Sequence, residues 1–82
     1  MSDFDDFEEA AVSRPWRVWL HSTSGMYEQY DGYVDVRVAV DSTETHSSRH
    51  ELFAAAVKEL ARTSFPDRRG LDFWRFERAE RL

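Results

Sequence analysis

The sequence contains no cysteine, 3 glycines and 2 prolines, and no apolar run near the ~20 residues that would span a bilayer. The missing cysteines exclude a disulfide framework, thiolate zinc sites and cysteine nucleophiles together. The glycines form no phosphate-binding loop. The N-terminus is acidic, whereas a secretory signal is basic and then apolar. We therefore expect a soluble, cytoplasmic protein with no membrane partner.

The composition is that of a small folded domain. The chain has 82 residues, of which 41% are hydrophobic and 15% aromatic. A domain of this size buries about 60% of the surface that its unfolded chain exposes. The Phe, Trp and Tyr residues enlarge this one core, and we expect some of them to remain outside it.

The charge is distributed unevenly along the chain. The net charge is -5, and it comes from five acids that precede the first basic residue, Arg14: Asp3, Asp5, Asp6, Glu8 and Glu9. All basic residues except Lys58 are arginines, whose planar group can stack and donate in pairs. The excess of arginine near the C-terminus is too small to predict a nucleic-acid site.

The sequence divides into an acidic N-terminal segment, 1–14, and a single compact domain, 15–82. Asp5 or Asp6 could cap a short helix through Ala11, which would end before Pro15. The alternative is a terminus without regular structure.

Alternating side chains predict three strands. Residues 16–21 form the first strand and residues 33–41 the second, in which Val34, Val36, Val38 and Val40 share one face. Turn signals at 22–25 and at Asp31-Gly32 separate these two strands. Residues 71–78 form a third strand, followed by a charged tail.

A helix is predicted between the second and third strands. Ser48-Arg49-His50-Glu51 matches a capping box, and an apolar stripe of about four turns follows from Leu52 to Ala61. Phe65-Pro66 ends the helix. The fold class is therefore α+β: a two-layer ββαβ domain, in which one amphipathic helix packs on one face of a mainly antiparallel three-stranded sheet. The strand order 2-1-3 is favoured because it keeps the sheet antiparallel throughout.

One helix covers only one face of such a sheet, so the opposite face should carry aromatic and arginine side chains. We predict a partner-binding surface at Trp19, Tyr33, Arg37, Trp74 and Arg75, with Asp3, Asp5, Asp6, Glu8 and Glu9 steering association. Two other uses of this face remain open. The acidic segment could fold back over it with Phe4 and Phe7, or a homodimer could bury it.

Catalytic and metal sites are not predicted. His46 and His50 have the spacing of two ligands on one helical face, but a helix that starts at Ser48 leaves His46 outside it. Ser22, Ser24 and His21 lack a nucleophile-elbow pattern. Asp35 and Asp41 share one face of the second strand, with Arg37 between them. An ordinary cross-strand salt bridge is the expected role of these charges. We therefore expect no enzyme, no cofactor and no metal.

These features favour a small acidic protein-interaction module whose partner is another protein or a nucleoprotein complex. In size and charge it is comparable to phage-derived inhibitors such as anti-CRISPR proteins, which obstruct a basic surface. The alternatives are a single-stranded nucleic-acid-binding domain, disfavoured by the negative charge, and a self-associating structural subunit.

Overall fold

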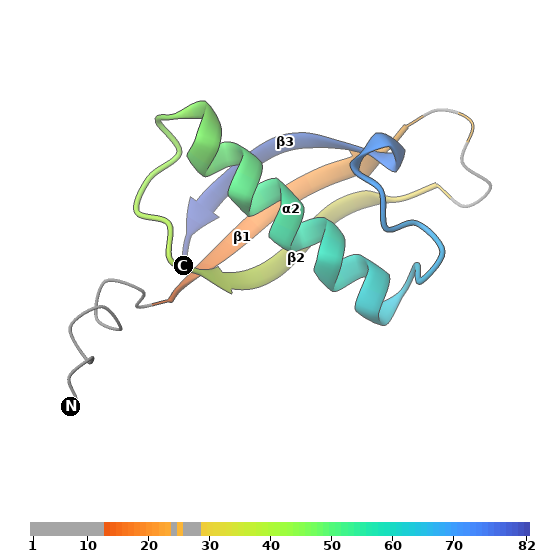
Figure 1. Cartoon of the computed structure of the whole chain (residues 1–82), viewed down its shortest axis with the longest axis horizontal. Helices are drawn as coiled ribbons and strands as arrows, with labels where there is room; N and C mark the ends of the chain where they lie inside the picture. The colour runs from red at the N-terminus through yellow and green to blue at the C-terminus, as the bar shows by residue number, and fades with distance from the viewer. Residues whose placement is uncertain (1–12, 24, 26–28) are drawn as a thin grey trace.

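The computed structural model describes residues 13–23, 25 and 29–82, which form a three-stranded antiparallel sheet crossed on one face by a helix (Figure 1). In chain order the elements are β1 (Arg14–Ser22), β2 (Asp31–Val38), α2 (His46–Thr63), a short 3-10 turn (Leu71–Phe73) and β3 (Trp74–Arg81). The strand order is β2-β1-β3. The predicted ββαβ arrangement and strand order are confirmed. The acidic segment and its short helix lie outside the described residues.

The pairing of β1 with β2 points the valines of β2 toward the helix. Trp16 lies opposite Val36 and Val18 opposite Val34. Because side chains alternate along a strand, Tyr33 and Asp35 point to the other face. The strand is shorter than predicted and ends at Val38, although Val40 beyond it is still buried.

The pairing of β1 with β3 is interrupted by a bulge. Trp19 lies opposite Arg78 and Leu20 opposite Phe76, so Glu77 is the extra residue on β3. A bulge of one residue locally breaks the alternation of side chains. It therefore determines which aromatic residues of β3 enter the core.

The helix begins earlier than predicted. Its N-cap is Thr45, whose side chain accepts a hydrogen bond of 3.0 Å from the Ser48 backbone N–H. Ser48 is thus the third residue of the helix, and the prediction that His46 lies outside the helix is wrong. At the other end, the backbone N–H groups of Ser64 and Phe65 both donate to the carbonyl of Leu60. The helix ends before Pro66, as predicted.

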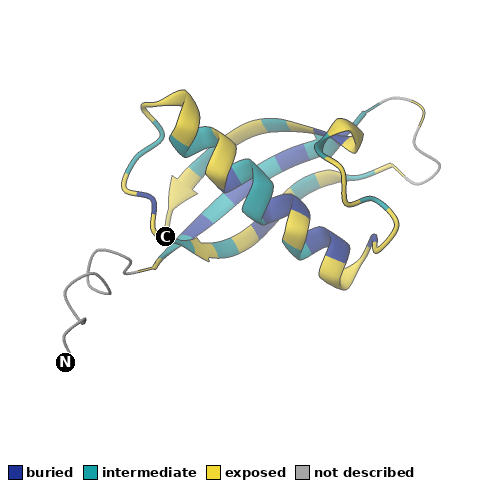
Figure 2. Cartoon of the chain, in the orientation of Figure 1, coloured by how far each residue is buried: buried dark blue, intermediate teal, exposed yellow. Residues whose placement is uncertain are grey.

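The core lies between the helix and the centre of the sheet (Figure 2). Its largest fully buried side chains are Trp74, Leu20, Leu52, Val18 and Val57. The indole N–H of Trp16 donates to the carbonyl of Val40 at 2.9 Å, and that of Trp74 donates to the carbonyl of Arg68 at 3.2 Å. Two tryptophans thus anchor loops to the sheet as well as filling space.

Trp74 corrects the predicted binding surface. The prediction placed it on the open face, but only 1% of its surface is exposed and it packs edge-on against Tyr30 and Phe65. The third strand runs over 74–81 instead of 71–78, and the expected charged tail pairs with β1 up to Arg81. No helix within the described part of the chain is both long enough and apolar enough to cross a membrane.

Candidate interaction surface

The face of the sheet opposite the helix carries a row of stacked arginine and aromatic side chains. The guanidinium of Arg78 lies 3.6 Å from the centroid of the Trp19 ring. The Trp19 and Tyr33 rings lie 5.8 Å apart, and the guanidinium of Arg17 lies 4.1 Å from the Tyr33 centroid. We call these four residues the arginine–aromatic row. It crosses all three strands, because Tyr33, Trp19 and Arg78 are register partners.

One end of the row is fixed by a two-point ion pair. Arg17 donates from Nε to Asp35 at 2.8 Å and from its terminal nitrogen at 3.1 Å. This bonding holds the pKa of the Asp35 carboxyl below its usual range and raises the pKa of Arg17. A planar guanidinium held in this way keeps its flat face on Tyr33, which is still 48% exposed.

The charges around the row compensate one another. Arg78 is paired with Glu80, and Nδ1 of His21 lies 2.5 Å from Oε2 of Glu77. By strand alternation and pairing, the outward side chains include as many basic groups as acidic ones: Arg17, Arg37, Arg75 and Arg78 against Asp31, Asp35, Glu77 and Glu80. This face is therefore rich in arginine without being strongly basic.

The structure brings together only part of the predicted site. Trp19 and Tyr33 lie side by side in the row, and Arg75 is exposed on β3 opposite His21. Arg37 is exposed near the end of β2. Trp74 lies in the core, and the five acids of the N-terminal segment lie outside the described residues.

Sequence reasoning did not select Arg17 and Arg78 for this site. Alternation alone places Arg17 on this face, because an arginine two residues before an outward tryptophan shares its side of the sheet. Alternation does not place Arg78 there, because only the bulge at Glu77 brings it opposite Trp19.

Ser22 and His21 bond to other groups and not to each other, and Ser24 lies outside the described residues. Ser22 is buried, and its hydroxyl donates to Gln29 and accepts from the backbone of Tyr30. His21 is paired with Glu77 on the outer face, away from that hydroxyl.

The two histidines of the first helical turn do lie on one face, with ring centroids 6.3 Å apart. In the described ranges no group of three or more His, Asp or Glu side chains gathers as metal ligands do.

Comparison with known proteins adds no identification, since no protein-family model, curated protein or solved structure matches the chain. The arrangement of its own residues is what suggests a function.

Proposed function

We propose that this protein is a non-enzymatic interaction module that binds another protein through the arginine–aromatic row. The observation that carries this proposal is the continuous stack of Arg78, Trp19, Tyr33 and Arg17 on a face that the helix does not cover. Trp, Tyr and Arg are the residues that most often dominate binding energy at protein interfaces. Stacking and the ion pair to Asp35 hold these side chains in place before binding, which reduces the entropy lost on association.

A protein partner is favoured over nucleic acid by the electrostatics of this face. Binding to single strands also uses aromatic stacking, but it requires cations that can neutralise phosphates. Here Arg17 and Arg78 are paired with Asp35 and Glu80, and the face as a whole is balanced in charge. A single-stranded nucleic-acid-binding domain is therefore the second candidate.

The most specific form of the proposal is an inhibitor that occupies a basic surface of a nucleoprotein complex in the cytoplasm. The five acids before Arg14 account for the net charge of -5 and would steer the chain toward such a surface. Small size and acidity are also the basis for the comparison with phage inhibitors of the anti-CRISPR type.

Matched affinity captures test the proposed surface. The wild-type chain, Trp19→Ala and Arg78→Ala serve as baits in a lysate of the native host, and His50→Ala, an exposed helix residue, serves as the control. We expect one protein to be retained by the wild type and the control and lost with both variants. Interface hot spots cost at least about 2 kcal/mol on truncation, or roughly thirtyfold in affinity. A partner retained by all four baits would contradict the proposal.

Two further measurements distinguish the alternatives. A fluorescence titration with mixed single-stranded oligonucleotides at two salt concentrations tests whether the chain is a single-stranded nucleic-acid-binding domain. That function requires tight binding that weakens as the salt concentration rises. Light scattering over a range of concentrations tests the self-associating subunit. A homodimer that Trp19→Ala dissociates would mean that a second copy occupies the row.

The acidic segment is tested through association kinetics with the captured partner. Reversing Asp3, Asp5, Asp6, Glu8 and Glu9 to lysine should lower the on-rate and reduce its dependence on salt, because steering acts before contact. An unchanged on-rate would exclude these acids from the mechanism.

A further inference from the structure

The outer edge of β2 offers hydrogen-bonding groups that the sheet does not use. In the described chain β2 pairs only with β1. The bond from Ser22 N–H to the Tyr30 carbonyl, at 2.8 Å, sets the phase of this ladder, so Gly32, Val34 and Val36 bond to β1. The backbone N–H and C=O groups of Tyr33, Asp35 and Arg37 consequently point to the open edge, where the Tyr33 carbonyl already accepts a hydrogen bond of 2.9 Å from the Tyr30 hydroxyl. Pro15, which has no N–H, stands opposite Arg37 as this phase requires.

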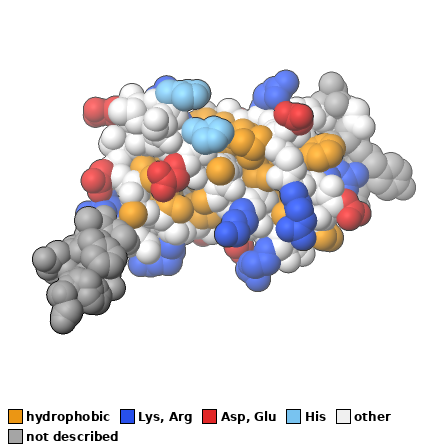
Figure 3. Space-filling view, in the orientation of Figure 1, with side chains coloured by type: hydrophobic (Ala, Val, Ile, Leu, Met, Phe, Trp, Pro, Cys, Tyr) orange, Lys and Arg blue, Asp and Glu red, His pale blue; other side chains and the backbone are white. Residues whose placement is uncertain are grey.

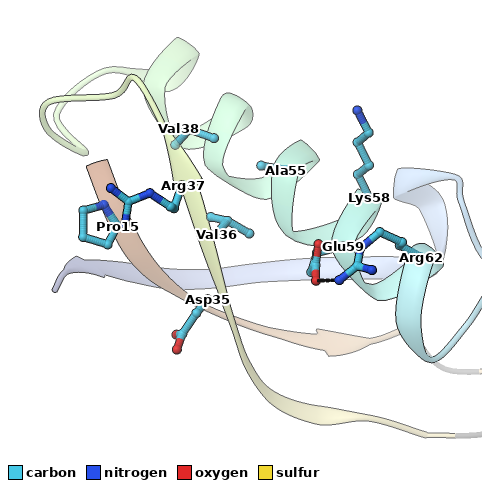
Figure 4. Close-up of a pocket in the computed structure, with 9 residues that line it drawn as sticks. All are labelled: Pro15, Asp35, Val36, Arg37, Val38, Ala55, Lys58, Glu59 and Arg62. Atoms are coloured by element: carbon cyan, nitrogen blue, oxygen red, sulfur yellow. Dashed lines mark hydrogen bonds and ion pairs between the residues drawn. The ribbon is translucent and has the colours of Figure 1, made fainter. Parts of the chain in front are cut away.

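A groove runs beside this edge, between β2 and the helix (Figure 4). Its volume is about 570 Å³, and its lining includes the apolar side chains of Val36, Val38 and Ala55. Figure 4 shows both valines pointing toward the helix and Asp35 pointing to the other side of the sheet. Side chains that alternate along a strand added here would therefore enter the groove at every second position.

The charged groups at the groove that are not already paired are basic. Asp35 is engaged by Arg17, and Glu59 is engaged by Arg62 through two hydrogen bonds. Arg37 and Lys58, by contrast, have no acidic partner within the described part of the chain. In Figure 3 basic side chains, with apolar ones between them, lie where the C-terminal half of α2 passes over the sheet.

We propose that this edge binds an extended segment of another protein, in which apolar side chains alternate with Asp or Glu. The segment would add a fourth strand beside β2 and form backbone hydrogen bonds with the N–H of Tyr33 and with both groups of Asp35 and Arg37. Its apolar side chains would pack on Val36, Val38 and Ala55. Its carboxylates, at the alternate positions, would meet Arg37 on the outer face of β2.

This inference goes beyond the proposed function and does not rest on it. The arginine–aromatic row is a surface of side chains on one face of the sheet, whereas the edge site consists of backbone groups and a groove on the helix side. Either one can fail while the other stands.

The test begins with selection from a random library of linear peptides displayed on phage, with the full chain immobilised. Enriched sequences should alternate apolar and acidic residues. A synthetic peptide with the most enriched sequence should then shift the amide NMR signals of residues 33–37 and 55–62 in the full chain. No enrichment, or shifts confined to Trp19 and Arg78, would overturn the proposal.

Substitutions at Arg37 separate the role of its charge from that of its backbone. Arg37→Gln removes the charge and should raise the Kd of the peptide about two- to fivefold. Arg37→Pro also removes the edge N–H, which donates to nothing within the sheet, and should raise the Kd about fivefold more. The matched control is Arg81→Pro. Arg81 lies on β3, opposite Trp16 of β1. The N–H of the next residue, Leu82, points toward β1 and donates to Pro15, so the N–H of Arg81 points the opposite way, to the outer edge of β3. The control should leave the Kd unchanged.

Other occupants give distinct results. If residues 1–12 of the chain itself fill the groove, reversing their acids will shift the amide signals of 33–37 without any peptide present. If a second copy fills it, light scattering will show a dimer that Arg37→Pro dissociates. Either result would overturn the assignment to a segment of another protein. Melting curves of each proline variant confirm that it is folded.

Discussion

Trp74 and Trp19 should lose very different amounts of stability on the same substitution, because one lies in the core and the other on the open face. Trp74→Phe removes the hydrogen bond to the Arg68 carbonyl, a loss of about 1 kcal/mol, and leaves that carbonyl without its partner. It also leaves space next to Phe65 and Tyr30, whose rings pack edge-on against the indole. With the cost of this cavity added, we expect the free energy of unfolding to fall by about 2–3 kcal/mol. A chain of this length has a free energy of unfolding of about 4–12 kcal/mol, so the effect is large.

Urea unfolding followed by circular dichroism measures this difference. With a slope of about 1 kcal/mol per molar urea, the midpoint for Trp74→Phe should fall by about 2–3 M. Trp19→Phe is the matched control, since a phenyl ring keeps the contacts with Arg78 and Tyr33, and its midpoint should fall by less than about 0.5 M. Equal losses for both variants, or a larger loss at Trp19, would refute the orientation of β3 and with it the arginine–aromatic row.

Two further predictions concern the helix cap and the cross-strand ion pair. Thr45→Ala should destabilise the protein by about 1 kcal/mol, whereas Ser48→Ala should cost less than half as much; the reverse order in thermal melts would restore Ser48 as the cap. The lowered pKa of Asp35 stabilises the folded state above the usual aspartate range, and this contribution is lost as the pH falls below about 4. Because the pair is solvent-exposed, the effect should be small: Asp35→Asn should melt slightly lower than wild type at pH 7, and the difference should be smaller at pH 2.5. An equal difference at both pH values would contradict this account.

The alternation of side chains was sufficient to predict most of the architecture. The four valines from Val34 to Val40 mark one face of a strand so clearly that its buried side could be assigned. The preference for antiparallel neighbours then gave the strand order. The helix stripe from Leu52 to Ala61 likewise predicted which residues would meet the sheet, and all but Phe53 among its large members are buried.

Alternation failed where the backbone departs from it. In β3 strict alternation would place Trp74, Phe76 and Arg78 on one face, and the bulge at Glu77 breaks this set. Trp74 and Phe76 point inward before the bulge, yet Arg78 points outward after it to reach Trp19. Nothing in the local sequence marks the bulge, because it depends on how β3 fits against β1. The start of the helix was missed for a different reason. Residues 42–48 contain several hydroxyl side chains, and each of them is able to act as the N-cap.

The two proposed surfaces meet at β2, and strand geometry makes them separable by experiment. Tyr33, Asp35 and Arg37 present side chains to the outer face and backbone groups to the open edge at the same time. A side-chain substitution at Tyr33 therefore tests the row and leaves the edge hydrogen bonds intact, whereas proline at Arg37 removes an edge donor and leaves Trp19, Tyr33 and Arg78 in place. A partner that binds by the row should lose affinity only with the first change. A partner that adds a strand should lose affinity mainly with the second, so one captured protein compared against both variants shows which surface it uses.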